Sequence, residues 1–510
     1  MQRRLKMKRK TKLMLNSASS LLYQAITMVC GFILPRLFIS QYGSEVNGLV
    51  SSVTQFLGFI SLAECGVGAV VQSSLYKPLA DNDTDEISRI VVSSDRFFRR
   101  IAYILAGYTV FLMAVYPLIT LESFGYLDTL LLIFVISIST FAQYYIGMTY
   151  RLLLSADQLG FIQYTIHAAS LILNTVACIL LVKAGASIQI VKLTTSLIFV
   201  AQPLILTVIA RRRYKINRKI KVTGEPIKQK WNGLAQHIAA VVLGNTDTVV
   251  LTLLSTLQNV SIYAVYHFVV NGVKQIIVSL TNGMQAMFGN MIAKSETDEL
   301  NRSFDRIEWI LHTAVTLAFS ITALLIIPFI KVYTANFEDS ADYIVPAFAY
   351  MITLAQAAYC LRLPYNIMVL AAGHYRQTQT SAIIEAVINI VVSVVLVFRF
   401  GLIGVAIGTF AAMVYRTVYL AVYLSKHIIH RKLRHFLLHI AVDVIGVTAL
   451  FFIVKMLAPD FYTMGSVSYL EWLILAIKVG FTALAVFTVT NCVFYFPKLK
   501  SAFLSLIKKK

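Results

Sequence analysis

Long apolar runs, each of about 20 residues or more, recur along the chain and alternate with short polar connections. At about 1.5 Å per residue, a helix of this length crosses about 30 Å of hydrocarbon, and the runs lack the two-residue alternation of barrel strands. The pattern therefore predicts an all-α, polytopic membrane protein with about fourteen transmembrane helices. We expect the spans at residues 14–39, 46–76, 97–120, 127–150, 160–183, 187–210, 232–257, 262–293, 306–333, 343–370, 379–399, 402–424, 436–458 and 472–495.

Composition and charge agree with this class of protein. Only 14% of the residues are charged, against about 25% in soluble domains. Of the 45 Lys and Arg residues, 35 fall in segments that are cytoplasmic if the N-terminus is inside. We therefore expect a plasma-membrane protein with both termini in the cytoplasm. The net charge of +21 is spread over several membrane-proximal segments, which favours contact with anionic lipid over binding of nucleic acid.

The longest basic connection, RRRYKINRKIKVTGEPIKQKW at 211–231, follows six expected spans. An internal repeat supports a division there, because YRLLLSADQLGFIQY (150–164) is similar to YNIMVLAAGHYRQTQ (365–379). Chance similarity among apolar helices is the alternative. The repeat predicts two pseudo-symmetric six-helix lobes followed by two further helices. The expected domains are an N-terminal lobe at 1–210, a basic cytoplasmic linker at 211–231, a C-terminal lobe at 232–424 and two additional helices with a basic tail at 425–510.

The external connections are too short to form a catalytic domain, and no motif for a cofactor or a metal is present. The five cysteines lie inside apolar runs, and their number and spacing predict no disulfide framework. The acidic segment DNDTDE, residues 81–86, lacks the glycine and final glutamate of a calcium loop, so we interpret it as an exposed loop that caps the next helix. We expect a protein that is not an enzyme, with no catalytic residue, metal or cofactor.

Polar side chains inside the spans are the candidates for function, because charge in hydrocarbon is costly and tends to face an interior path. Helical spacing places five such residues on one face of the 262–293 span. They are His267, Asn271, Lys274, Thr281 and Gln285. We predict that this face lines an aqueous cavity and binds the substrate. Polar packing between helices is the alternative.

Three further cations are candidates to bind substrate. Arg36 follows Pro35, where a kink would turn the side chain towards the cavity, but a place near the membrane interface also lets it reach the lipid headgroups. Arg362 and Arg416 lie deeper within their spans, and we predict that both face the cavity.

Three carboxylates are candidates for ion coupling or charge pairing. Asp247, in the segment GNTDTVVL, could form a buried ion pair with Lys274 or contact the substrate. Glu64 and Glu385 could each bind a proton or a sodium ion. A hydrogen bond between packed helices is the alternative for both.

Several segments together resemble a known family. They are LPRLFISQYGSEVNGLVSSVTQFLGFISLAECGVGAVV (34–71), LSADQLGFIQY (154–164), NTDTVVL (245–251) and IYAVYHFVVNGVKQ (262–275). Over essentially its whole length the chain resembles the Wzx-type polysaccharide flippases of the multidrug/oligosaccharidyl-lipid/polysaccharide exporter (MOP) superfamily. The motifs are mostly glycines, prolines and isolated polar positions, so they identify the family better than the substrate.

The resemblance implies a two-lobed transporter that moves a polyprenyl-diphosphate-linked oligosaccharide from the inner to the outer leaflet of the bacterial plasma membrane by alternating access. It also implies a cationic cavity, with Arg36 at the LPR position and Lys274 at the GVKQ position, and an acidic residue at Glu64 in AECGVG. Arg362 and Arg416 have no motif behind them. The expected partners are the lipid-linked oligosaccharide, membrane lipid, a polysaccharide polymerase and glycosyltransferases, and we expect a monomer.

Other functions remain open. In a drug or cation antiporter of the same superfamily, carboxylates would dominate the cavity, whereas Lys274 is the charge most clearly placed on the polar face. A flippase for a lipid-linked peptidoglycan or teichoic-type precursor fits the same residues. A membrane polymerase or glycosyltransferase would need a large external loop, and the sequence has none of that length.

Overall fold

The computed structural model describes residues 9–64, 67–120, 124–220, 234–281, 283–335, 337, 341–457 and 468–507. Eighteen α-helices and one π-helix form this described part, and it contains no β-strand. The predicted all-α class is therefore confirmed. The chain divides into two compact units, Met1–Val249 and Val250–Lys510, and each is described separately below.

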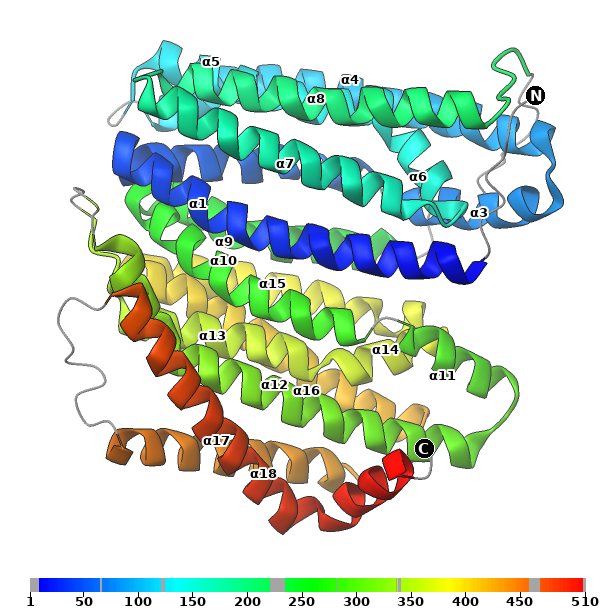
Figure 1. Cartoon of the computed structure of the whole chain (residues 1–510), viewed down its shortest axis with the longest axis vertical. Helices are drawn as coiled ribbons and strands as arrows, with labels where there is room; N and C mark the ends of the chain where they lie inside the picture. The colour runs from blue at the N-terminus through cyan, green and yellow to red at the C-terminus, as the bar shows by residue number, and fades with distance from the viewer. Residues whose placement is uncertain are drawn as a thin grey trace. The chain divides into compact units, whose positions relative to one another are not determined.

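The first unit holds the helices drawn from blue to green in Figure 1. A single helix, α9, passes from this unit into the second. The helices are α1 (Arg9–Gly58), α2 (Ser61–Glu64), α3 (Val67–Asp81), α4 (Thr84–Ile119), α5 (Tyr126–Ala142), the π-helix η1 (Gln143–Gly147), α6 (Met148–Ala156), α7 (Gly160–Lys183), α8 (Ile188–Arg213) and α9 (Leu234–Leu254).

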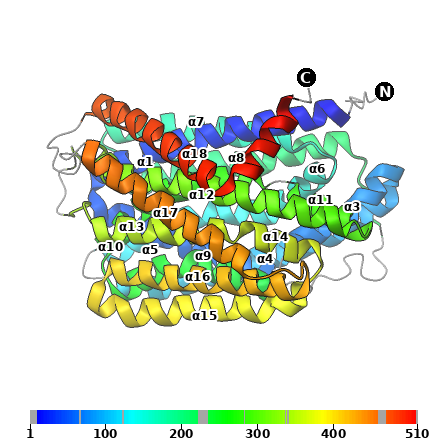
Figure 2. The same ribbon diagram turned by 90° about the horizontal axis from the view of Figure 1, so that it is seen from below.

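The second unit holds the helices drawn from green to red. They are α10 (Leu257–Leu280), α11 (Met284–Ala293), α12 (Thr297–Thr334), α13 (Pro346–Leu361), α14 (Leu363–Ala371), α15 (Tyr375–Phe400), α16 (Leu402–His427), α17 (Arg434–Leu457) and α18 (Tyr469–Ile507). Figure 2 shows α15 and α16 running side by side, and they pack closely along their whole length.

Eleven helices in the described residues are long and apolar enough to cross a membrane. The expected count of about fourteen spans is consistent with the structure once interrupted spans are joined. Glycine explains one interruption, because Gly283 has a φ of 86° and separates α10 from α11 inside the single span expected at 262–293. The span expected at 343–370 is likewise divided, into α13 and α14, next to Pro364, which lacks a backbone N–H.

The two copies of the sequence repeat have the same local structure. In each copy a short helix, α6 or α14, is followed by a residue with positive φ and then by a long helix, α7 or α15. The positive-φ residues are Gln158 (59°) and Gly373 (76°), which align in the repeat. Each long helix is followed by a glycine with positive φ, Gly185 or Gly401. This agreement supports a true internal repeat. The predicted domain boundaries at 210, 231 and 424 remain predictions.

Asn16 and Lys12 of α1 hold the first of these turns in place. The Asn16 side chain donates to the Gln158 carbonyl over 2.9 Å and accepts from the backbone N–H of Phe161 over 2.6 Å, so it satisfies an otherwise free donor at the start of α7. Lys12 forms a 2.9 Å ion pair with Asp157. The turn between α6 and α7 is thereby fixed to the first helix of the chain.

Two other expectations can be compared with the structure. Asp83, in the acidic segment DNDTDE, caps α4 by accepting from the backbone N–H groups of Asp85 and Glu86 over 3.1 Å and 3.0 Å, so the expected capping role is confirmed. Of the cysteines, Cys30, Cys178 and Cys360 are buried, Cys492 is exposed, and all four are free. Cys65 lies outside the described residues.

Candidate substrate site

A cationic centre lies in the second unit, where α10 and α13 pack together. The Lys274 ammonium of α10 is 4.9 Å from the centroid of the Tyr359 ring, and the Arg362 guanidinium is 4.3 Å from the same centroid. Tyr359 is on α13, and Arg362 lies between α13 and α14. The negative face of an aromatic ring attracts cations, so one tyrosine holds two positive charges close together. We define Lys274, Tyr359 and Arg362 as the cationic centre.

Three polar side chains on one face of α10 have no polar partner among the described residues of the second unit. His267, Asn271 and Lys274 are spaced by four and three residues, so they lie on one face of the helix. Among the described residues of the second unit, none of them forms a hydrogen bond or an ion pair. His267 stacks on Tyr263 with a centroid distance of 5.3 Å, and Lys274 lies over the ring of Tyr359. This face can therefore offer a cation and two neutral polar groups to a ligand.

The polar face is shorter than the sequence predicts. Thr281 follows the last residue of α10, and its hydroxyl donates to the Val278 carbonyl. Gln285 lies beyond the turn at Gly283, on α11, where its amide donates to the Tyr375 hydroxyl over 3.2 Å. The prediction that Gln285 shares a helical face with Lys274 is wrong, because the left-handed glycine ends the helix before it.

Arg362 and Arg416 share one carboxylate. Arg362 forms a close ion pair with Glu385 of α15, and the Nε of Arg416 on α16 is 3.7 Å from the other oxygen of Glu385. Arg416 also donates to the Thr378 carbonyl over 2.9 Å and to the Ser381 hydroxyl. Arg416 is thus tied to α15 on several sides, whereas Lys274 is not tied to any acceptor in the described residues.

The candidate residues of the first unit lie on different elements. Arg36 is a partly buried residue of α1, which continues through Pro35 and departs from helical geometry at Gly43, where φ is 85°. The departure from helical geometry is therefore found at Gly43, eight residues after Pro35. Glu64, the last residue of α2, accepts a close hydrogen bond from the Tyr144 hydroxyl of the π-helix.

Asp247 is a buried residue of α9, with 6% of its surface exposed. An ion pair between Asp247 and Lys274 would join the two units, and it remains a prediction. The roles of Arg36, Glu64 and Glu385 in binding or coupling also remain predictions.

An apolar groove in the second unit was missed by the sequence analysis. It lies between α12, α13 and α17 and has a volume of about 710 Å³. Val315, Phe319, Leu354, Val447 and Phe451 contribute to its walls, and its only charged lining residues are Asp443 and Lys455. The helix α17 belongs to the C-terminal pair that has no counterpart in the repeat, and its strongly apolar sequence gave no signal of a groove.

The groove and the cationic centre use different faces of α13. Leu354, Ala357 and Leu361 line the groove, whereas Tyr359 and Arg362 belong to the cationic centre. The groove residues 354, 357 and 361 are spaced by three and four and share one face of the helix, whereas Tyr359 is rotated by about 200° from Ala357.

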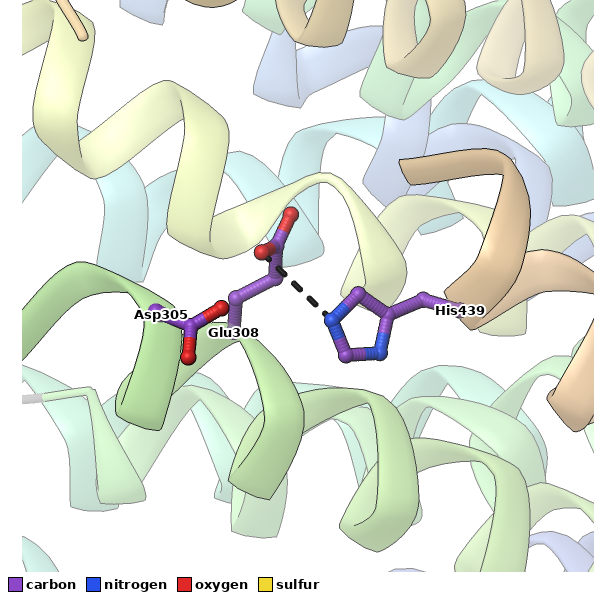
Figure 3. Close-up of side chains that lie close together, drawn as sticks. All are labelled: Asp305, Glu308 and His439. Carbon is purple, nitrogen blue, oxygen red and sulfur yellow. Dashed lines mark ion pairs between the residues drawn. The ribbon is translucent and has the colours of Figure 1, made fainter. Parts of the chain in front are cut away.

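A cluster of titratable side chains lies further along α12 and α17, towards the N-terminal ends of both helices. Figure 3 shows Asp305 and Glu308 on one helix and His439 on another, with Nε2 of His439 3.5 Å from Glu308. The potential ligand atoms of these three residues lie within 4.8 Å of one another. Arg431 forms a close ion pair with Glu308, and Lys498 forms a 2.8 Å ion pair with Asp305, so cationic side chains already neutralise these carboxylates. We therefore interpret the cluster as an ion-pair network and not as a metal centre.

Comparisons with known proteins identify the fold. No protein-family model and no curated protein matches the sequence. Among solved structures, lipid II flippase MurJ in an inward closed conformation is 15% identical, with a TM-score of 0.72 over 95% of this chain and 100% of that chain. An inward-facing multidrug resistance MATE family transporter of the MOP superfamily is 13% identical, with a TM-score of 0.58 over 78% of this chain and 95% of that chain.

An outward-facing multidrug resistance MATE family transporter is also similar, at 15% identity and a TM-score of 0.52 over 82% of this chain and 94% of that chain. The chain therefore has the fold of the MOP-superfamily transporters. Together with its many apolar helices, this fold makes it a multi-pass membrane protein.

Proposed function

We propose that this protein is a flippase that moves a polyprenyl-diphosphate-linked oligosaccharide from the inner to the outer leaflet of the bacterial plasma membrane, by alternating access, for surface polysaccharide biosynthesis. A diphosphate carrying sugars cannot cross hydrocarbon unaided, because removing water from its charges is very costly. The transport step needs a polar route for the head group and an apolar route for the tail. It requires no covalent chemistry, so the proposed function is not enzymatic.

The observation that carries this proposal is the cationic centre, together with the polar side chains on the same face of α10 that form no hydrogen bond among the described residues of the second unit. Lys274 and Arg362 supply positive charge for the diphosphate, and Asn271 and His267 supply hydrogen bonds for adjoining oxygens. The apolar groove, on another face of α13, can hold part of the apolar chain of the lipid.

Lys274 offers the sharpest test. Replacing Lys274 with alanine removes the one cation of the centre that has no carboxylate partner in the described residues. A hydrogen bond to a charged group contributes about 1.5–3 kcal/mol, so we expect a loss of transport of about tenfold or more. In cells that depend on this gene, the lipid-linked oligosaccharide should accumulate in the inner leaflet, as measured by the accessibility of its sugar to an external enzyme.

Lys478→Ala is the matched control. Lys478 lies on an apolar part of α18 with an exposed side chain, away from the cationic centre. This variant should keep wild-type transport and a wild-type level of protein in the membrane. Full surface polysaccharide in the Lys274→Ala cells, at a normal level of the variant protein, would refute the role proposed for Lys274.

A flippase for a lipid-linked cell-wall precursor is the second candidate, because a lipid II flippase is among the structures with this fold. The same experiment separates the two functions through the chemistry of the accumulating lipid. A sugar-only oligosaccharide on the polyprenyl diphosphate supports the surface-polysaccharide function, and a peptide-bearing or polyol-phosphate lipid supports the wall precursor. An antiporter for cationic drugs is disfavoured, because three of the four charged residues around Tyr359 and Glu385 are cations.

A further inference from the structure

A chain of hydrogen-bonded titratable groups connects the apolar groove to the ion-pair network of Figure 3. Nδ1 of His312 on α12 is 2.6 Å from Oδ2 of Asp443 on α17, and its Nε2 is 3.0 Å from the Tyr365 hydroxyl. Tyr365 in turn donates to Glu308 over 2.7 Å. Asp443 lines the groove, so a ligand in the groove can contact this end of the hydrogen-bonded series.

The hydrogen bonds determine where protons must lie. The single hydrogen of Tyr365 is donated to Glu308, so the Tyr365 oxygen accepts from His312, and Nε2 of His312 carries a hydrogen. The 2.6 Å contact between Nδ1 and Asp443 also needs a hydrogen between its atoms. His312 and Asp443 therefore hold one proton more than a neutral imidazole and a free carboxylate would, whichever of the two atoms it resides on.

The charges around the pair explain why it holds this proton. Three carboxylates, Asp305, Glu308 and Asp443, face two permanent cations, Arg431 and Lys498, which leaves one uncompensated negative charge. Glu308 and His312 have exposed side-chain fractions of only 0% and 2%. A net charge is costly in such a buried place, and one bound proton makes the cluster neutral.

Other titratable groups face the cluster from each element packed against it. His439 stacks on His312 at a centroid distance of 4.9 Å, its Nδ1 is 2.7 Å from the Tyr495 hydroxyl, and its Nε2 is 3.5 Å from Glu308. His435 lies one turn before His439, near Arg431 and Glu308. The full set is Asp305, Glu308 and His312 of α12, Tyr365 of α14, Arg431 before α17, His435, His439 and Asp443 of α17, and Tyr495 and Lys498 of α18.

We propose that the Asp443–His312 pair is a proton-binding site, and that proton binding there and the filling of the groove by an apolar chain favour each other. In an empty groove, water can solvate the Asp443 carboxylate and permit loss of the proton. An apolar chain displaces this water, and the charge-neutral, protonated pair is then the favourable state. By thermodynamic linkage, the bound proton strengthens binding of the apolar ligand to the groove by the same factor. This inference rests on the proposed function only in assigning the groove to a polyprenyl chain.

The test uses an uncharged polyprenol as the probe, so that the diphosphate and the cationic centre take no part. The polyprenol is added to the purified full-length protein in weakly buffered detergent, and protons taken up are measured with a pH indicator from about pH 5 to 9. Binding of the polyprenol is measured separately by quenching of tryptophan fluorescence. We expect an uptake of about one proton per bound polyprenol at its maximum.

Asp443→Asn should abolish this uptake, because the amide holds its hydrogens at every pH of the titration. Lys455→Gln is the matched control, since Lys455 is the other charged residue of the same groove and has no place in the hydrogen-bonded chain. Its uptake should equal that of the wild type.

Proton uptake by the wild-type protein is sufficient to refute the inference, so the test does not require a variant that folds. Polyprenol binding without proton uptake at any pH, or no polyprenol binding at all, refutes it, as does full uptake by a folded Asp443→Asn protein. The two proposals can fail separately. If no proton uptake is measured but Lys274→Ala cells accumulate the lipid-linked oligosaccharide in the inner leaflet, the proton-binding site is refuted and the proposed flippase function is supported.

Discussion

Glu385 lies between Arg362 and Arg416, and the exposed side-chain fractions of the three residues are 6%, 11% and 6%. At the scale of single residues, the buried cations of the second unit differ in whether a carboxylate of the protein pairs with them. Arg416 is paired with a carboxylate, a carbonyl and a hydroxyl, as expected of a residue that joins helices. Lys274 has no such partners in the described chain, as expected of a residue that awaits a ligand.

Replacing Glu385 with glutamine should lower the stability of the protein. The change leaves Arg416 buried without its carboxylate, and breaking a buried ion pair from one side costs about 3–5 kcal/mol. The apparent melting temperature of the purified protein in detergent should fall by several degrees. Adding Arg416→Met should recover much of the loss, because no unpaired charge at that position remains.

Glu299→Gln provides the control for this prediction. Glu299 pairs with Arg302 and accepts a 3.4 Å hydrogen bond from Ser303 on an exposed part of α12, and exposed pairs contribute about 0–1 kcal/mol. Equal melting temperatures for the wild type and Glu385→Gln would show that the buried triad is not stabilised by its carboxylate.

Helical periodicity predicted which side chains of one helix lie close together. It did not predict which side chains of different helices lie close together. His267, Asn271 and Lys274 were grouped correctly because helical spacing alone brings them together. The pairing of Arg362 with Glu385 was not predicted, because it depends on how α13 and α15 pack. The His312 cluster was missed for the same reason, although titratable residues at 305, 308 and 312 and at 435, 439 and 443 repeat with helical spacing and were a signal of two facing polar stripes.

At the scale of elements, close approach of helices depends on glycine. Gly404 and Gly408 of α16 lie one turn apart and face α15. A Cβ at Gly408 would lie 2.7 Å from the backbone nitrogen of Ser393, a distance that real side chains do not adopt. The spacing is typical of small residues that let transmembrane helices touch along their backbones.

Gly408→Ala should therefore separate α15 from α16 and destabilise the protein. Overpacking of a tight interface typically costs about 1–3 kcal/mol, and here the obstacle is backbone that cannot move aside alone. The variant should show a lower apparent melting temperature and faster proteolysis between the two helices.

Gly480→Ala is the matched control on α18, where an added Cβ would meet no atom within 4 Å. Alanine is the better helix former, so this variant should be as stable as the wild type or slightly more stable. A Gly408→Ala protein with unchanged stability would mean that the two helices are not in backbone contact.

Helix breaks were the part of the elements that the sequence analysis predicted least well. The apolar run at 262–293 continues through Gly283, so hydropathy alone indicated one span. Glycine is common in transmembrane helices, and its presence does not by itself reveal a positive φ. The π-helix at 143–147 had no sequence signal at all, because it is a local change in hydrogen bonding within an otherwise regular apolar run.

At the scale of the whole molecule, hydropathy and charge predicted the fold class, and the MOP-type fold agrees with the resemblance. These properties predict topology well because the bilayer constrains every span in the same way. The identity of the sugar was not predictable, since hydrogen-bonding groups for sugars are generic.

The orientation of the chain is a prediction at this scale. Residues 498–510 carry five cations, which favours a cytoplasmic C-terminus. Alkaline phosphatase fused after Lys510 should be inactive, and green fluorescent protein fused there should fluoresce. As a control, alkaline phosphatase inserted at Gly185, in a connection expected to be external, should be active. The reversed pattern would invert the topology and with it the proposed direction of transport.

Tyr144 and Tyr359 occupy the same register in the two copies of the repeat, at an offset of 215 residues, yet Tyr144 faces the acidic Glu64 and Tyr359 faces the basic Lys274 and Arg362. Duplication of an ancestral gene followed by divergence produces such a pattern, in which a shared aromatic residue acquires neighbours of opposite charge. The present-day halves are consequently not interchangeable, and a chimaera built from two C-terminal copies would carry only the cationic version.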